Sequence, residues 1–230
     1  MVTIRQLQTL LPDVTTMTIH RDLDELEEIG LLVKMRGGAR AAQYEGDPIF
    51  AAREHMNIKE KELIAKKALP LITPNSSIFL DAGTTNLALA RKLPDYNLTI
   101  FTTGANFSYE LARLHNASVQ ICGGSLNRLN LAISGFSTLA MLEKVNIDIA
   151  FIGVSGYLDG FTCGKESEML VKQAVIEKAR KSVLLMDASK MGKLMPYTFA
   201  ALADIAYVIT NAALPEAFMR AAAEAGVTVL

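Results

Sequence analysis

Residues 77–85 read Ser-Ile-Phe-Leu-Asp-Ala-Gly-Thr-Thr, and this stretch joins an apolar run to the start of a helical pattern. The apolar run predicts a strand that ends at Asp81, and residues 86–93 predict a helix after a turn at Gly83. A loop of this kind directs backbone N–H groups at an anion. We expect the hydroxyl groups of Thr84 and Thr85 to cap the helix, to bind an oxyanion, or to do both. The alternative is a plain strand-to-helix connection with a threonine cap.

The composition indicates a soluble protein with a large core. The chain has 230 residues, of which 50% are hydrophobic and 20% charged, and this length favours one or two domains. The net charge of −1 provides no overall attraction to DNA or to an anionic membrane, so any DNA-binding surface must be local. With two cysteines, no signal-like start and no membrane-length apolar run, we expect a cytoplasmic protein. Its three histidines lie far apart, and we expect no metal and no cofactor.

Residues 1–44 differ from the rest of the chain and predict a winged helix-turn-helix. Apolar residues at helical spacing predict a first helix that stops at Pro12, and Thr15 is the expected cap of a second helix that ends at Gly30. Residues 31–34 predict a short strand, and residues 35–40 a hairpin tip with two cations. The apolar side chains that we expect the second helix to bury are Met17, Ile19, Leu23, Leu26 and Ile29.

The charge of this segment leaves a second interpretation open. Its first 45 residues hold five basic and seven acidic side chains, and the acidic ones gather in the later half of the second helix, away from its first turns. A small helical hairpin that serves dimer contacts is therefore the alternative to a DNA-binding domain.

The remainder predicts an α/β domain over residues 57–230, after a linker at 45–56 that shows no clear periodicity. Asn57 and Glu60 resemble a capping box at the start of a helix. Predicted strands cover residues 77–81, 98–102, 118–122, 147–154, 182–187, 205–210 and 227–230. Helical patterns cover 85–93, 105–114, 134–145, 165–180 and 215–225. Alternation of apolar strands with helices predicts a mainly parallel, Rossmann-like sheet covered by helices on both faces.

Loops rich in glycine and hydroxyl groups follow five of these strands. Glycine lets a ligand approach the backbone, and threonine, serine and asparagine supply neutral hydrogen bonds. Because ligands bind beyond the carboxyl ends of parallel strands, these loops predict one binding edge. The charged residues near that edge are Arg128, Lys172 and Lys190, as partners of a phosphate, and Asp81, Glu168 and Asp187, as acceptors from sugar hydroxyls.

Several enzyme classes are disfavoured. No dinucleotide-binding Gly-x-Gly-x-x-Gly follows a strand, and the chain has neither a Walker-type phosphate loop nor a Gly-x-Ser-x-Gly elbow. Cys122 ends an apolar strand, which indicates a small buried residue rather than a nucleophile.

The motifs together resemble the DeoR family of bacterial transcriptional regulators. The run from Thr18 to Leu23, the segment Arg36-Gly37-Gly38-Ala39, and the loops at 80–85, 123–124, 148–153 and 187–190 carry the resemblance over nearly the whole chain. The resemblance implies a winged helix-turn-helix that usually represses, and a sensor domain that binds a phosphorylated sugar. It further implies a sensor fold similar to ribose-5-phosphate isomerase and the coenzyme A transferases.

The resemblance also implies the roles of individual residues. Those expected to face operator DNA are Thr15, Thr16, Thr18, His20 and Arg21 on the second helix, with Arg36 and Gly37 on the wing. Those expected to line the effector pocket are Asp81, Gly83, Thr84, Thr85, Thr103, Gly123, Gly124, Arg128, Gly153, Lys172 and Lys190. The implied partners are double-stranded operator DNA, a phosphorylated sugar and further copies of the chain, as a homodimer or homotetramer.

Departures from the family pattern leave two alternatives. The family carries a further helix before the point that matches Met1, His20 stands where arginine is usual, and Ser155 replaces an acid. A sensor that has lost DNA binding is one alternative. A sugar-phosphate isomerase is the other, although the loop at 155–158 lacks the paired acids expected of that enzyme.

Overall fold

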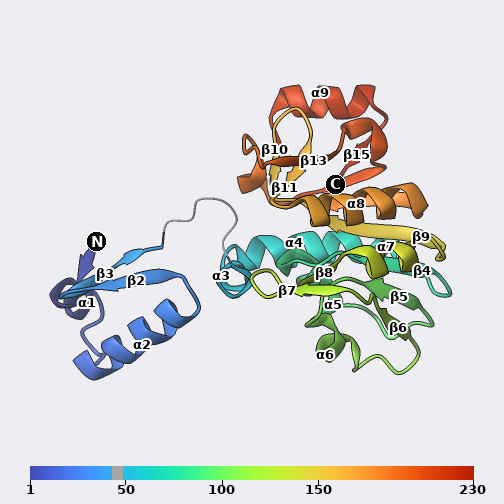
Figure 1. Cartoon of the computed structure of the whole chain (residues 1–230). Coiled ribbons are helices and arrows are strands. Elements are labelled where there is room, and N and C mark those ends of the chain that lie inside the picture. The colour runs from blue at the N-terminus through green and yellow to red at the C-terminus, as the bar shows by residue number, and fades with distance from the viewer. Residues whose placement is uncertain (43–48) are drawn as a thin grey trace. The chain divides into compact units, whose positions relative to one another are not determined.

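The computed structural model describes residues 1–42 and 49–230, which form two compact units, Met1–Met56 and Asn57–Leu230 (Figure 1). Part of the predicted linker, residues 45–48, lies outside the described residues. Across the described ranges, none of the helices combines the length and the apolar character needed to cross a membrane.

The first unit is a winged helix-turn-helix. Helices α1 (Ile4–Leu10) and α2 (Thr16–Glu28) pack on a small antiparallel sheet in the order β1 (Val2–Thr3), β3 (Gly38–Ala41) and β2 (Leu32–Met35). Its core is formed by the buried side chains of Ile19, Leu23 and Ala39, against which partly buried Ile4, Leu7, Val14 and Leu32 pack.

Helix α2 starts as predicted but buries fewer residues than predicted. The Thr15 hydroxyl accepts a hydrogen bond from the backbone N–H of Thr18 at 3.2 Å, which confirms the cap. Met17 is 83% exposed and Leu26 36% exposed, so the expectation that both face inward is wrong. Met17 lies about 200° around the helix from buried Ile19. Leu26 lies nearly a turn beyond Leu23, where the small core ends.

The predicted linker contains a short helix. Residues 50–55 form α3 (Phe50–His55), in which Phe50 and Ala52 are buried. No helix was predicted here, because six residues are too few to show a helical period.

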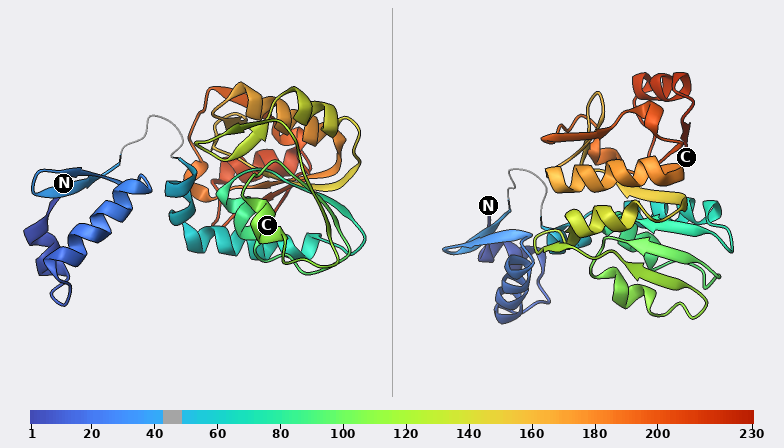
Figure 2. Two further views of the ribbon diagram at one scale, coloured as in Figure 1. Left: turned by 60° about the horizontal axis from the view of Figure 1, so that its bottom comes forward. Right: turned by 45° about the vertical axis from the view of Figure 1, so that its right-hand side comes forward.

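The second unit is built on a seven-stranded parallel sheet, shown with its helices in Figure 2. In order across the sheet, its strands are β15 (Thr228–Val229), β14 (Tyr207–Ile209), β12 (Ala179–Leu185), β9 (Ile147–Gly153), β4 (Ser77–Leu80), β5 (Thr99–Thr102) and β6 (Ser118–Ile121). All seven predicted strands lie in this sheet, and every neighbouring pair is parallel. The predicted fold class is confirmed.

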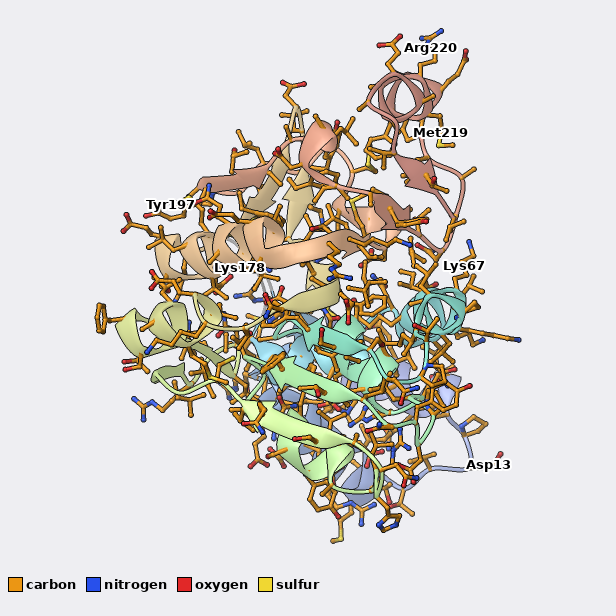
Figure 3. The ribbon with its side chains drawn as sticks, turned by 90° about the vertical axis from the view of Figure 1, so that its right-hand side faces the viewer. Asp13, Lys67, Lys178, Tyr197, Met219 and Arg220 are labelled. Carbon is orange, nitrogen blue, oxygen red and sulfur yellow. The ribbon has the colours of Figure 1, made fainter. Side chains whose placement is uncertain are left out.

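Helices cover both faces of this sheet. They are α4 (Ile58–Ala68), α5 (Thr84–Ala90), α6 (Phe107–Leu111), α7 (Phe136–Leu142), α8 (Glu166–Lys178) and α9 (Glu216–Glu224). Parallel crossovers are right-handed, and the step from β4 to β5 runs opposite to the step from β9 to β12. Helices α5 and α8, which make these two steps, therefore lie on opposite faces. Lys67 ties α4 to the sheet, since its ammonium donates to the Thr210 carbonyl at 2.8 Å (Figure 3).

The predicted capping box of α4 is wrong. Asn57 has a left-handed backbone, with a φ of 51°, and its side chain caps nothing. The amide instead donates to the carboxylate of Asp187 at 3.4 Å, at the far end of β12. A tertiary contact has therefore replaced the local one.

Two small sheets were not predicted. Strands β7 (Ser125–Asn127) and β8 (Ala132–Ser134) form a hairpin after β6. Strands β10 (Gly156–Tyr157), β11 (Phe161–Cys163) and β13 (Tyr197–Ala200) form an antiparallel sheet that contacts α8. Short 3₁₀ turns occur at Leu69–Leu71, Ala188–Lys190 and Leu202–Asp204.

Candidate functional site

The five loops singled out in the sequence follow five adjacent strands. Strands β12, β9, β4, β5 and β6 are neighbours and parallel, so their carboxyl ends lie along one edge of the sheet. The direction of the crossovers reverses between β4 and β9. Ligands of open α/β sheets bind at this kind of switch point. Asp81 after β4 and Gly153 at the end of β9 therefore mark the centre of the candidate site.

A buried ion pair lies at this centre. Asp81 and Lys172 are 5% and 6% exposed, and the Lys172 ammonium donates to Oδ2 of Asp81. The same ammonium donates to the Gly153 carbonyl at 2.8 Å, and the Gly153 N–H donates to Oδ2 of Asp81 at 3.0 Å. Three residues far apart in the sequence thus fix one another, and together they join β4, β9 and α8.

The surroundings of Lys172 keep its side chain charged. Burial by itself lowers the pKa of Lys172, but the charge of Asp81, the hydrogen bond to it and the charge of Glu168 outweigh burial and raise that pKa. The Phe199 ring lies 5.2 Å from the ammonium and adds a cation–π contact. The expectation that Lys172 neutralises a phosphate stays a prediction, and in this structure its charge is paired with that of Asp81.

The loop after β4 differs from the expectation at its helix start. Gly83, not a threonine, occupies the cap position of α5, and no side chain caps that helix. Its φ of 147° favours glycine, and a Cβ there would meet nothing within 4 Å. Thr84 is buried and Thr85 half-buried. Thr103, from the next loop, is 1% exposed and accepts from the Ala82 N–H at 3.3 Å.

The β7–β8 hairpin carries the next group of predicted residues. Gly123, Gly124 and Arg128 are exposed on or beside it. Gly124 has a φ of 147°, and a Cβ there would lie 2.4 Å from the Thr138 hydroxyl, so only glycine fits. The Thr138 hydroxyl also donates to the Gly123 carbonyl at 2.6 Å, which fixes the turn into the hairpin.

The hairpin crosses the loop after β5. The N–H of Ile133 donates to the Thr103 carbonyl at 2.8 Å, and the N–H of Ala105 donates to the Leu131 carbonyl at 3.0 Å. The amide of Asn130 donates to Glu168 on α8. Sequence reasoning missed Asn130, because two three-residue strands give too short an alternation to identify a hairpin.

The remaining polar residues of this edge are held by neighbours. Oδ1 of Asp187, which is 4% exposed, accepts from the Ser189 N–H at 3.0 Å. Lys190 is half-buried. Asn86, which is fully buried and was missed, lies beside the Phe151 carbonyl and the Gly153 N–H, and it bonds both when its amide nitrogen is assigned to the side of the carbonyl. Among the described residues no group of three histidine, cysteine or acidic side chains suits a metal ion.

The first turns of α2 form the second surface of interest. His20 and Arg21 are exposed, and Arg21 lies 3.8 Å from Asp22 and 3.9 Å from Glu25. These distances, at side chains 51–70% exposed, give weak pairs that leave the guanidinium accessible.

The wing presents the remaining predicted residues of this unit. Arg36 and Gly37 are exposed at the turn between β2 and β3, and Gly37 has a φ of 83°. The Gly37 carbonyl accepts from the Ile4 N–H at 3.0 Å, which holds the wing to the start of α1.

Comparisons with known proteins agree with this arrangement. Residues 1–45 match the DeoR-like helix-turn-helix domain, and residues 56–212 match the DeoR C terminal sensor domain. The chain is 35% identical to the HTH-type transcriptional regulator GlpR of Haloferax volcanii, over 93% of this chain and 85% of that protein. It is 31% identical to the HTH-type transcriptional repressor GlcR of Bacillus subtilis, over 94% and 84% of the two chains. A lactose phosphotransferase system repressor of Staphylococcus epidermidis is 33% identical, over 86% and 81%.

Among solved structures of low identity, one has a TM-score above 0.5 and shows the same fold. The δ subunit of eIF2B from Chaetomium thermophilum has a TM-score of 0.51 and 13% identity, over 70% of this chain and 58% of that subunit. Ribose 5-phosphate isomerase from Methanocaldococcus jannaschii has a TM-score of 0.43 and 19% identity, over 59% and 55%. The chain thus spans a little over half the length of these two structures. From the two matched domains and the relatives at 31–35% identity, the chain belongs to the DeoR family and is a helix-turn-helix transcriptional regulator.

Proposed function

We propose that this regulator represses a carbohydrate-catabolism operon and that a phosphorylated sugar alters its binding to operator DNA. The relatives named as a repressor and as a lactose phosphotransferase system repressor support this role. The observation that carries the sensing half is the convergence of five glycine- and hydroxyl-rich loops at one edge of the sheet, around its switch point.

The phosphate of the effector binds along the loops after β4 and β6 in this proposal. Gly83 and Gly123 leave open space beside the backbone, since a Cβ at either position meets nothing within 4 Å. The hydroxyls of Thr84 and Thr85 provide neutral hydrogen bonds. The cationic side chains that we place near the phosphate are those of Arg128 on the β7–β8 hairpin and Lys190 after β12.

Lys172 and Asp81 hold the loops in place rather than contact the phosphate in this proposal. The ion pair and the hydrogen bonds of Gly153 and Thr103 fix the backbone of the loops after β4 and β9, which bind the ligand in this proposal. Asp187 and Glu168 supply carboxylate acceptors for sugar hydroxyl groups.

The DNA-binding half of the proposal uses α2 and the wing. His20 and Arg21 face the major groove, Thr15, Thr16 and Thr18 fix the start of the helix, and Arg36 and Gly37 contact phosphates. Two or four copies of the chain present paired helices to two half-sites. The effector then shifts the population of arrangements that fit the operator spacing.

The test is binding of the full chain to the DNA that flanks its own gene. Fluorescence anisotropy is measured at several salt concentrations, with and without glucose 6-phosphate, fructose 1-phosphate and ribose 5-phosphate, and with the unphosphorylated sugars. We expect specific binding with a steep salt dependence, changed by one phosphorylated sugar and not by its parent sugar.

A pair of isosteric variants locates the effector site. Thr85→Val removes one hydroxyl of the β4 loop, and Thr99→Val makes the same change at the opposite end of the sheet, at the start of β5. Loss of a hydrogen bond to a charged group weakens effector binding about tenfold or more in Thr85→Val only. Equal behaviour of the two variants refutes this placement.

Other outcomes separate the remaining hypotheses. Effector binding without DNA binding indicates a sensor that does not act on DNA by itself. Steady conversion of ribose 5-phosphate that is lost in Asp187→Asn indicates an isomerase.

A further inference from the structure

The apolar side chain of Met17 is exposed to solvent rather than buried in the core of its unit. It is 83% exposed, on the first turn of α2, while the core of the same unit lies on the opposite side of the helix. Helical periodicity places it on one face with His20 and Arg21, three and four positions later. A single exposed apolar residue is ordinary in general. Met17 differs because it shares a helix face with His20 and Arg21, which are expected to face DNA.

The polar side chains beside Met17 are already engaged within the protein. The hydroxyls of Thr15 and Thr18 lie 2.9 Å apart, and the Thr15 hydroxyl also accepts from the Thr18 backbone. The Thr16 hydroxyl accepts from the amide of Gln8 on α1. In the opening turn of α2, these three threonines fix the helix start, and Met17 is the long side chain that projects from it.

The start of the second helix is where a helix-turn-helix touches bases. In this fold its N-terminal residues reach the base edges of the major groove. Within the major groove, the C5-methyl of thymine is the apolar group, and the other base edges offer hydrogen-bond donors and acceptors. A methionine placed against a polar edge leaves that edge unsatisfied, whereas against a methyl group it gains contact area.

We propose that Met17 is a specificity-determining residue that packs on the C5-methyl group of one thymine in each operator half-site. The thioether is flexible and polarisable, so it adapts to the position of the methyl group without a fixed geometry. His20 and Arg21 lie one turn later on the same face, so their contacts with DNA determine which base pair Met17 reaches. The inference rests on the proposed placement of α2 in the DNA.

The test replaces the methyl group and the side chain separately. The full chain first selects its preferred duplexes from a random-sequence pool, and each thymine of the selected site is then replaced by uracil, which lacks only the methyl group. At one thymine per half-site we expect the wild-type chain to lose about fourfold in affinity, equivalent to one buried methyl group. On the thymine duplex, Met17→Ala is expected to bind at least fourfold more weakly than the wild type. On the uracil duplex, the variant and the wild type are expected to bind with equal affinity.

Met219→Ala is the matched control. Met219 lies on α9 of the other unit and is 40% exposed (Figure 3), so its replacement removes an accessible methionine without touching α2. This variant is expected to bind both duplexes like the wild type. Because Met17 is exposed, Met17→Ala is expected to keep the wild-type melting curve, so a changed affinity reports on DNA contact and not on folding.

The outcomes distinguish failure of this inference from failure of the proposed DNA contacts. A selected site at which no uracil replacement changes affinity refutes the role of Met17. Equal losses by Met17→Ala on the thymine and uracil duplexes also refute it, since the two changes then act independently. If the wild-type chain selects no sequence at all, the whole proposed DNA-reading face is refuted.

Discussion

Replacing Lys172 by methionine removes a buried ammonium group and leaves the carboxylate of Asp81 without its charged partner. Both residues are at most 6% exposed, so water reaches the remaining charge poorly. Breaking a buried ion pair from one side costs about 3–5 kcal/mol in free energy of unfolding. For a unit of this size, that loss lowers the melting temperature by about 6–20 °C. The hydrogen bond to the Gly153 carbonyl is lost in the same step.

A second substitution tests the cause. In the double variant Asp81→Asn with Lys172→Met no charge remains, and an amide oxygen still accepts from the Gly153 N–H. Most of the lost stability is therefore expected to return. Urea unfolding followed by circular dichroism gives the free energies of wild type, both single variants and the double variant. A cost below about 1 kcal/mol for Lys172→Met, or strict additivity of the two changes, refutes the reasoning.

The pH dependence gives an independent check. The pKa of Lys172 is raised above 10.5 in the folded chain, so its stabilising contribution is complete below that pH. As the pH rises through the raised pKa, the ammonium loses its proton and the contribution disappears. The stability difference between wild type and Lys172→Met is therefore expected to be constant near neutral pH and to shrink at strongly alkaline pH. A difference that persists unchanged there contradicts the charge-based explanation.

Three further predictions concern other residues of the chain. Ile19→Ala deletes a side chain that is 3% exposed in the small core and costs about 2–5 kcal/mol, so calorimetry should show the first unit melting early, with loss of DNA binding. The backbone N–H and hydroxyl of Ser77 lower the pKa of Asp148, so Asp148→Asn should lower the free energy of unfolding at neutral pH, and by less as acid protonates the wild-type carboxylate, as urea unfolding at several pH values would show. Burial raises the pKa of Cys122 and Cys163 to about 11, so iodoacetamide should modify both thiols in urea and neither in the folded chain at mildly alkaline pH.

The sequence predicts those parts of the fold that depend on long periodic segments. The apolar strands ending near Asp81 and Gly153 are almost uniformly hydrophobic, and such strands belong to a parallel sheet covered on both faces. Parallel topology then brings the five loops to one edge without any knowledge of the strand order.

Elements that depend on tertiary contacts could not be predicted. Asn57 carries the local signature of a helix cap, but its side chain contacts Asp187, which lies 130 residues later. Lys172 has the charge expected of a phosphate ligand, and only the folded arrangement shows that Asp81 neutralises it. Met17 has the hydropathy of a core residue, although the core of its unit is too small to include it.

The span of the Asp81–Lys172 pair has a consequence for the newly made chain. The two residues are 91 positions apart, and β4 reaches β9 only after β5, β6 and the hairpin between them have been synthesised. The winged unit ends at Met56, so the ribosome adds 116 residues between its completion and the arrival of Lys172. At about 5–20 residues per second, this interval is roughly 6–23 s. During each round of translation, helix α2 and the wing therefore exist before Lys172, which joins β4, β9 and α8 in the second unit, has been made.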